Sequence, residues 1–233
     1  MANTALAADN SEKFPNGVRW KSIPRDFTQT ATLVIFIKGG VFRENAANSG
    51  IGALTARTWL KSGKLLETVE YIGGGVSAGL ANDYFEISLS VPSAALPQGL
   101  PELRKQILRP AFTAEIFEKE KDLMLREMEA VKDDPNTLAY QQFLKATYGD
   151  HPYALWSDGS TESVIKLALD DVKTYYKNQV AAVDMIAVLA GNYSESDHKA
   201  IQDILKAVPK GSPVKINCAS AAIKKTERIE STD

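Results

Sequence analysis

The sequence predicts an α+β fold, in which a mainly antiparallel sheet of about five or six strands carries helices packed on one face. Residues 30–38 are apolar and β-branched and end at Gly39 and Gly40, which is typical of a buried strand. Residues 182–190 form a second strongly apolar run of this kind. Several segments between these two runs carry apolar residues at helical spacing. Strands and helices that are grouped, rather than strictly alternating, indicate the α+β class.

The remaining elements follow from local signals along the chain. A turn at residues 15–17 precedes a short strand that begins at Val18. Pro101 is expected to open one helix, and Thr113 to cap a long one. The full set of expected helices is 51–60, 65–72, 101–108, 113–131, 136–148, two short helices before residue 182, and 194–208; further strands are expected at 76–80 and 84–91.

Composition and charge exclude several classes of function. The chain has 233 residues and a formal charge of −2, so nothing in its electrostatics favours nucleic acid or an acidic membrane surface. No apolar run approaches the roughly 18 residues that a membrane helix needs. The single cysteine, Cys218, cannot form an internal disulfide. We therefore expect no nucleic-acid partner and no membrane partner.

The two ends of the chain differ from its middle. Ala5-Leu6-Ala7 matches the small-x-small pattern of a signal-peptidase site, but the basic and apolar segments that precede such a site are missing. Residues 1–14 are interpreted either as a disordered lead or as the remnant of an export signal, and the second interpretation favours a periplasmic or secreted location over a cytoplasmic one. Residues 15–208 form the expected domain. The polar residues 209–233 are expected to be a linker toward a second domain.

Simple catalytic sites are hard to assemble from this sequence. Only two histidines exist, His151 and His198, and no Gly-x-Ser-x-Gly elbow or glycine-rich phosphate loop accompanies them. The carboxylates are more informative, because Glu120 and Glu127 lie two helical turns apart and therefore project from the same face of one helix. A solvated acidic face explains that spacing as well as a functional pair does.

Several motifs, taken in order, resemble the pitrilysin/insulinase family of zinc peptidases, which includes the mitochondrial processing peptidases. The resemblance covers residues 15–208 and implies the fold of one half of such a peptidase. It is carried by the segments 16–18, 36–40 with Glu44, 49–52, 74–78, 117–128, 134–135 and 148–153.

The resemblance also exposes a departure at the active-site helix. Family peptidases carry His-x-x-Glu-His there, with two zinc ligands and a general base. The corresponding positions in this chain are Ala53, Ala56 and Arg57, whereas the distal zinc ligand and its supporting carboxylate correspond to Glu127 and Glu120, both retained. One carboxylate cannot replace three ligands. The resemblance therefore implies a pseudo-peptidase domain that binds no metal, needs no cofactor and is no enzyme on its own.

The positive charge at position 57 leads to a geometric prediction. A guanidinium can bridge carboxylates by paired hydrogen bonds and so replace the charge of a metal without its chemistry. We therefore expect Arg57 within roughly 4 Å of Glu127 or Glu120, the usual limit for an ion pair.

A second site follows from the same resemblance. Residues Ala78, Gly79, Leu80, Ala81 and Asn82 correspond to the edge strand that pairs with extended substrate peptide in active relatives. Their small side chains leave room for a peptide backbone. An ordinary edge strand without a ligand is the alternative interpretation.

These observations favour a noncatalytic subunit. We expect it to pair with an active zinc peptidase homologue, to continue into its own C-terminal half, and to help bind substrate peptide. A stand-alone binding or scaffold module, similar to some respiratory-complex core subunits of this family, is the first alternative. An active zinc metalloendopeptidase with differently placed ligands is the second.

Overall fold

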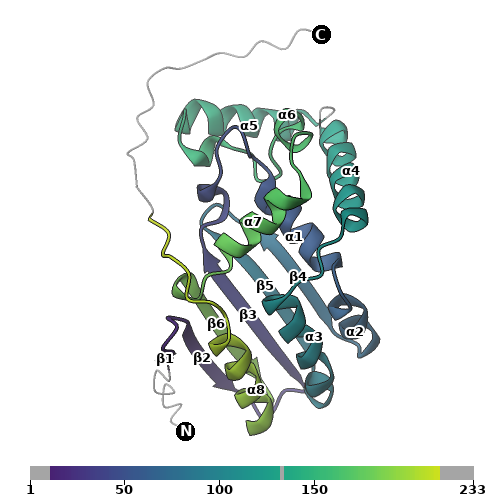
Figure 1. Cartoon of the computed structure of the whole chain (residues 1–233), viewed down its shortest axis with the longest axis vertical. Helices are drawn as coiled ribbons and strands as arrows, with labels where there is room; N and C mark the ends of the chain where they lie inside the picture. Colours follow the sequence, from purple (N-terminus) through teal and green to yellow (C-terminus); the bar gives the residue numbers. More distant parts are fainter. Residues whose placement is uncertain (1–10, 132–133, 216–233) are drawn as a thin grey trace, which may run out of the picture.

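A computed structural model describes residues 11–131 and 134–215. These residues form one six-stranded sheet with helices on one face, and Figure 1 shows α3 and α8 crossing in front of the strands. The strands are β1 Ser11–Lys13, β2 Arg19–Pro24, β3 Thr30–Lys38, β4 Gly75–Leu80, β5 Tyr84–Pro92 and β6 Met185–Gly191. The α-helices are α1 Ile51–Lys61, α2 Leu65–Tyr71, α3 Leu96–Leu108, α4 Ala114–Val131, α5 Pro135–Tyr148, α6 Thr161–Val164, α7 Leu169–Gln179 and α8 Glu195–Lys206. The 3-10 helices are η1 Gly40–Arg43, η2 Ser93–Ala95, η3 Pro152–Ala154 and η4 Ala182–Asp184.

The sheet has the strand order β1-β2-β6-β3-β5-β4. Every neighbouring pair is antiparallel except β2 and β6, which run parallel. The predicted α+β class, the mainly antiparallel sheet and the single helical layer are therefore confirmed. No helix in the described ranges is both long enough and apolar enough to cross a membrane.

The core lies between the sheet and the helices. Alternate residues of β3 point into it, and Leu33, Ile35 and Ile37 are 2% exposed or less. They share one apolar cluster with Trp59 of α1 and Leu103 of α3. A second, smaller cluster joins the first half of α1 to α4 and α7, and it supports the region of the candidate site.

Three boundaries differ from those predicted by more than two residues. Helix α3 begins at Leu96 rather than at Pro101, which lies inside the helix. The missing N–H of Pro101 removes one helical hydrogen bond, but the burial of Leu96 and Leu100 in the core stabilises the additional turn. The last strand begins at Met185 rather than at Ala182, because residues 182–184 form the 3-10 helix η4.

The third difference concerns the start of the domain. Residues 11–13 form β1, which pairs with β2, and Phe14 is 2% exposed. The expectation of a disordered lead is therefore wrong for residues 11–14, while residues 1–10 lie outside the described range. Ser11, Glu12 and Lys13 are polar, so a strand there depends on its neighbour rather than on apolar alternation.

Residues 209–215 return to the domain after α8. The N–H groups of Ala182 and Val183 donate to the carbonyls of Pro209 and Lys210 at 3.0 and 3.1 Å. The carboxylate of Asp184 then accepts from the N–H of Val214 at 2.8 Å. These contacts attach the first part of the expected linker to η4. Residues 216–233 lie outside the described range.

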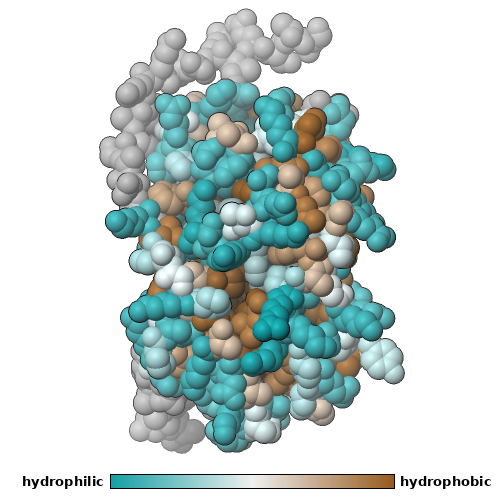
Figure 2. Space-filling model, viewed as in Figure 1, coloured by the Kyte–Doolittle hydropathy of each residue, from teal (hydrophilic) through white to brown (hydrophobic). Residues whose placement is uncertain are grey.

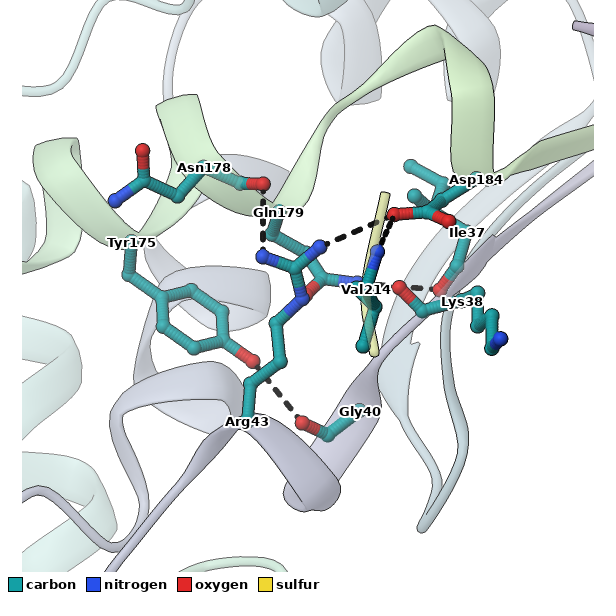
Figure 3. Close-up of polar contacts among 9 residues, drawn as sticks. All are labelled: Ile37, Lys38, Gly40, Arg43, Tyr175, Asn178, Gln179, Asp184 and Val214. Atoms are coloured by element: carbon teal, nitrogen blue, oxygen red, sulfur yellow. Dashed lines mark hydrogen bonds and ion pairs between the residues drawn. The ribbon is translucent and has the colours of Figure 1, made fainter. Parts of the chain in front are cut away.

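The same carboxylate also binds a guanidinium (Figure 3). Arg43 donates from Nη2 to Asp184 Oδ2 at 3.3 Å and from Nη1 to the carbonyl of Asn178 at 3.0 Å. The Asp184 side chain is only 5% exposed. One buried ion pair thus joins the end of α7, η4 and the returning segment.

Candidate functional site

The degenerate site, by which we mean Ala53, Ala56 and Arg57 at the positions of the expected zinc motif, lies on α1. A buried carboxylate fixes the start of this helix. Glu44 is 3% exposed, and its two oxygens accept from the N–H groups of Gly50 and Gly52 at 2.8 and 2.9 Å. These N–H groups have no partner within the helix, so the carboxylate replaces the missing acceptors. Burial raises the pKa of Glu44 to about 7, against the opposing effect of the two hydrogen bonds.

The three positions of the expected zinc motif have separate surroundings. Ala53 and Ala56 are buried, and each belongs to one of the two apolar clusters. Arg57 reaches α4, where its Nη2 lies 2.6 Å from Glu127 Oε2. The predicted ion pair between Arg57 and Glu127 is confirmed.

A third carboxylate, which the sequence did not predict, also approaches Arg57. Asp158 Oδ1 lies 3.8 Å from Arg57 Nη2 and belongs to the loop between η3 and α6. The hydrogen bond from Arg57 is the main cause that lowers the pKa of Glu127. Burial raises the pKa of Asp158, and the nearby guanidinium opposes that rise. Carboxylates of two different elements therefore lie next to Arg57.

The retained Glu120 behaves differently from Glu127. Glu120 is 6% exposed, whereas the Glu127 side chain is 59% exposed. The negative charge of Glu120 acts on Arg57 through space and helps to raise the pKa of the guanidinium, after the larger effects of Glu127 and Asp158. The two glutamates thus face the same arginine, but Glu127 makes the ion pair.

These residues do not fit a zinc ion. The site supplies carboxylates around a permanent cation, and Ala53 and Ala56 contribute no donor atoms. Over residues 11–131 and 134–215, no three His, Cys, Asp or Glu side chains are placed to hold a metal. The imidazole of His198 packs against Trp20 of β2, and that of His151 accepts from the N–H of Tyr153. The chemistry of this site is therefore that of an ion pair.

A pocket of about 360 Å³ opens beside the ion pair. Its apolar wall comes from α4, α5 and the loop that carries Asp158, and it includes Met124, Met128, Leu138 and Trp156. Glu127 and Asp158 also line it. The pocket can take an apolar side chain next to a charged one.

The predicted peptide-binding residues divide into two groups. Ala78, Gly79 and Leu80 belong to β4, the last strand of the sheet, which pairs with β5 on one side. Ala81 and Asn82 belong to the following turn, where their carbonyls accept from the N–H groups of Val41 and Phe42, 3.0 Å away in each case. Only the first three residues therefore lie on the sheet edge.

Comparison with known proteins identifies the family of the domain. The model of the insulinase family, peptidase family M16, matches residues 22–156. The probable mitochondrial-processing peptidase subunit beta of Schizosaccharomyces pombe is 24% identical over 203 residues, which are 84% of this chain and 44% of that protein. Cytochrome b-c1 complex subunit 1 of Mus musculus is 24% identical over 195 residues, which are 81% of this chain and 40% of that protein. The chain thus spans less than half the length of these two curated relatives.

The solved structures agree on the fold. A peptidase M16 inactive domain from Pseudomonas fluorescens superposes with a TM-score of 0.82 at 24% sequence identity. The match covers 92% of this chain and 54% of that one. At this identity the likeness establishes the architecture alone.

Proposed function

The chain belongs to the insulinase family of peptidases, and from this premise we propose that it is a noncatalytic member that pairs with an active zinc peptidase homologue and helps to bind substrate peptide. The observation that carries the proposal is the ion pair of Arg57 with Glu127 at 2.6 Å. The pair joins two positions that the family resemblance assigns to metal ligands, and Ala56, at the position that it assigns to the general base, has no group that could activate water.

The sheet edge supports a part in peptide binding. An extended peptide can add to an exposed edge strand through main-chain hydrogen bonds. Gly79 of β4 has open space where a side chain would stand, and Ala78 and Leu80 point inward toward the core. The apolar pocket beside Glu127 supplies a place for a substrate side chain.

Metal content tests the noncatalytic part. The purified 233-residue chain is expected to hold no stoichiometric zinc by elemental analysis and to leave peptides uncleaved. The matched positive control is Ala53→His with Arg57→His, which gives two imidazoles four residues apart and Glu127 as the third donor. Zinc near one equivalent in the unmodified chain, removable by a chelator, would falsify the proposal.

Pairing is tested by mixing the chain with an active homologue from the same organism. We expect a stable heterodimer on size exclusion at micromolar concentration, and faster peptide cleavage than the homologue achieves alone. Two independent peaks with unchanged cleavage would instead favour a scaffold module. The similarity to a cytochrome b-c1 complex subunit supports that second candidate.

A further inference from the structure

A pocket of about 630 Å³ lies at the end of α3. It is lined by the second half of that helix, by residues 109 and 111 after it, and by residues 63 and 64 between α1 and α2. Small-molecule sites in proteins usually have volumes of about 300 to 1,000 Å³. None of the lining residues belongs to the degenerate site or to the pocket beside Glu127, so this is a separate candidate site.

The pocket has an excess of positive charge. Its lining contains one acidic side chain, Glu102, and four basic ones: Lys64, Arg104, Lys105 and Arg109. Glu102 pairs with Lys105 at 2.5 Å. The other three basic residues are exposed and make no ion pair within the described part of the chain, and we call them the unpaired cations. In Figure 2, which shows the same side as Figure 1, strongly hydrophilic residues lie over α3.

The end of α3 does not need these charges for its own carbonyl groups. Basic side chains commonly lie in the last turn of a helix, because they can bind the carbonyls that have no partner there. Here buried donors do so instead. The carbonyl of Gln106 accepts from Trp59 Nε1 at 2.9 Å, and that of Ile107 accepts from the hydroxyl of Tyr176 at 2.9 Å. The unpaired cations therefore remain available to an anion.

The pocket also contains a buried acceptor that has no donor. Gln106 is 3% exposed, and its Nε2 donates to the carbonyl of Trp59 and, at 2.9 Å, to Ser62 Oγ. These two contacts fix the orientation of the amide. Its Oε1 then lies beside Gly63, where an added Cβ would come within 2.5 Å of it, and no donor in the described ranges reaches it. A hydroxyl group of a ligand can supply the missing hydrogen bond.

We infer that this pocket binds an organic di- or triphosphate, with the phosphate groups on the unpaired cations and a hydroxyl of the organic part on Gln106. A guanidinium can donate two parallel hydrogen bonds to a phosphate, and an ammonium binds it as a point charge. A single phosphate monoester carries no more than about two negative charges. Three unpaired cations therefore favour a ligand with more than one phosphate group.

The rest of the lining suits the organic part of such a ligand. Leu108 and Ala111 add apolar surface to the pocket, and Gly63 leaves the space in front of Gln106 Oε1 free of a side chain. The inference goes beyond the proposed function and does not depend on it, because the pocket shares no residue with the degenerate site or with the sheet edge.

Calorimetric titration of the 233-residue chain with ATP tests the inference. Magnesium is left out of the buffer, because it would neutralise the phosphates that the cations should bind. We expect ATP to bind at least tenfold more tightly than inorganic triphosphate, which lacks the organic part, and than a peptide of ten glutamates, which carries charge alone. Removal of the ribose hydroxyls, in 2′,3′-dideoxy-ATP, should weaken binding several-fold. Added salt should weaken all four ligands.

Two matched double variants locate the binding. Arg104→Gln with Arg109→Gln removes two unpaired cations and should weaken ATP about tenfold, as the loss of two exposed ion pairs allows. Arg19→Gln with Arg25→Gln makes the same change in net charge outside the pocket and should leave the affinity for ATP unaltered. All four arginines are exposed, so both variants should fold, and thermal unfolding checks this.

Three results would overturn the site. They are the absence of ATP binding, equal weakening by the two double variants, and binding of inorganic triphosphate or the glutamate peptide as tight as that of ATP. The last result would mean a general attraction for anions, or a surface for an acidic protein segment. None of them bears on pairing with an active homologue, which the size-exclusion experiment tests separately.

Discussion

Two arginine–carboxylate pairs in this molecule look alike but stand in different surroundings. Arg57 and Glu127 are 2.6 Å apart, with side chains that are 29% and 59% exposed. Arg43 and Asp184 are 3.3 Å apart, with side chains that are 19% and 5% exposed. The shorter pair is the more exposed one. Because water screens exposed charges, a mutation in the longer but more buried pair should lower the free energy of unfolding more than a mutation in the shorter pair.

The other contacts of each pair support the same expectation. Arg43 also binds the carbonyl of Asn178, and Asp184 also accepts from the N–H of Val214 (Figure 3), so the loss of either partner leaves a buried group without its main partner. Burial lowers the pKa of Arg43, and the charge of Asp184 opposes that effect. At the degenerate site, by contrast, solvent can reach Glu127 when Arg57 is removed.

The largest effect is expected for the buried pair. Arg43→Ala leaves the carboxylate of Asp184 buried and should lower the free energy of unfolding by about 4 kcal/mol. The matched control is Arg126→Ala, which breaks an exposed pair with Asp122 within α4 and should cost well under 1 kcal/mol. Urea denaturation measures both. A loss below 1 kcal/mol for Arg43→Ala would mean that Asp184 finds another donor or water.

Glu44 gives a third case, a buried carboxylate that is bound by two backbone N–H groups rather than by a guanidinium. Folding raises its pKa from 4.5 to about 7, so the folded state binds this proton more tightly than the unfolded state does. The stabilisation from the proton is complete below pH 4.5 and is lost as the pH rises through 7. The loss amounts to about 3 kcal/mol for a shift of this size.

The measurement is the free energy of unfolding between pH 4.5 and 8 for the wild type and for Glu44→Gln. The variant keeps a carbonyl acceptor but cannot titrate, so the difference between the two proteins isolates Glu44 from Asp158 and other groups. We expect the wild type to lose stability relative to the variant as the pH rises. Parallel curves would show that Glu44 keeps an ordinary pKa.

The sequence predicted the parts of the fold that local chemistry determines. Strand β3 ends where predicted because Gly39 and Gly40 follow it, and α4 begins after Thr113, whose hydroxyl accepts from the N–H of Ile116. Strand β1 was missed because a polar triplet gains its strand conformation only from β2. The inward and outward faces of β3 could not be distinguished, because its apolar run is continuous.

At the site, the sequence predicted the partner of Arg57 but not its full surroundings. The resemblance to the peptidase family implied Arg57 on α1 and, as its partner, Glu127 or Glu120 on α4. Asp158 lies on a loop, and nothing local distinguishes it from Asp150 or other loop carboxylates. Only the packing of that loop against α1 brings it within 3.8 Å of the guanidinium.

The smallest effect is expected at the degenerate site, and it tests whether burial or distance controls these pairs. Arg57→Ala should cost well under 1 kcal/mol, since Glu127 is mostly exposed and can be solvated. A double-mutant cycle with Glu127→Ala should give a coupling energy of about 0.5 kcal/mol, compared with about 2 kcal/mol or more for the cycle of Arg43 with Asp184. A coupling at Arg57 equal to that at Arg43 would show that the buried Glu120 and the nearby Asp158 share the guanidinium. The site would then be a three-carboxylate network that depends on its arginine, rather than a surface pair that replaced a metal.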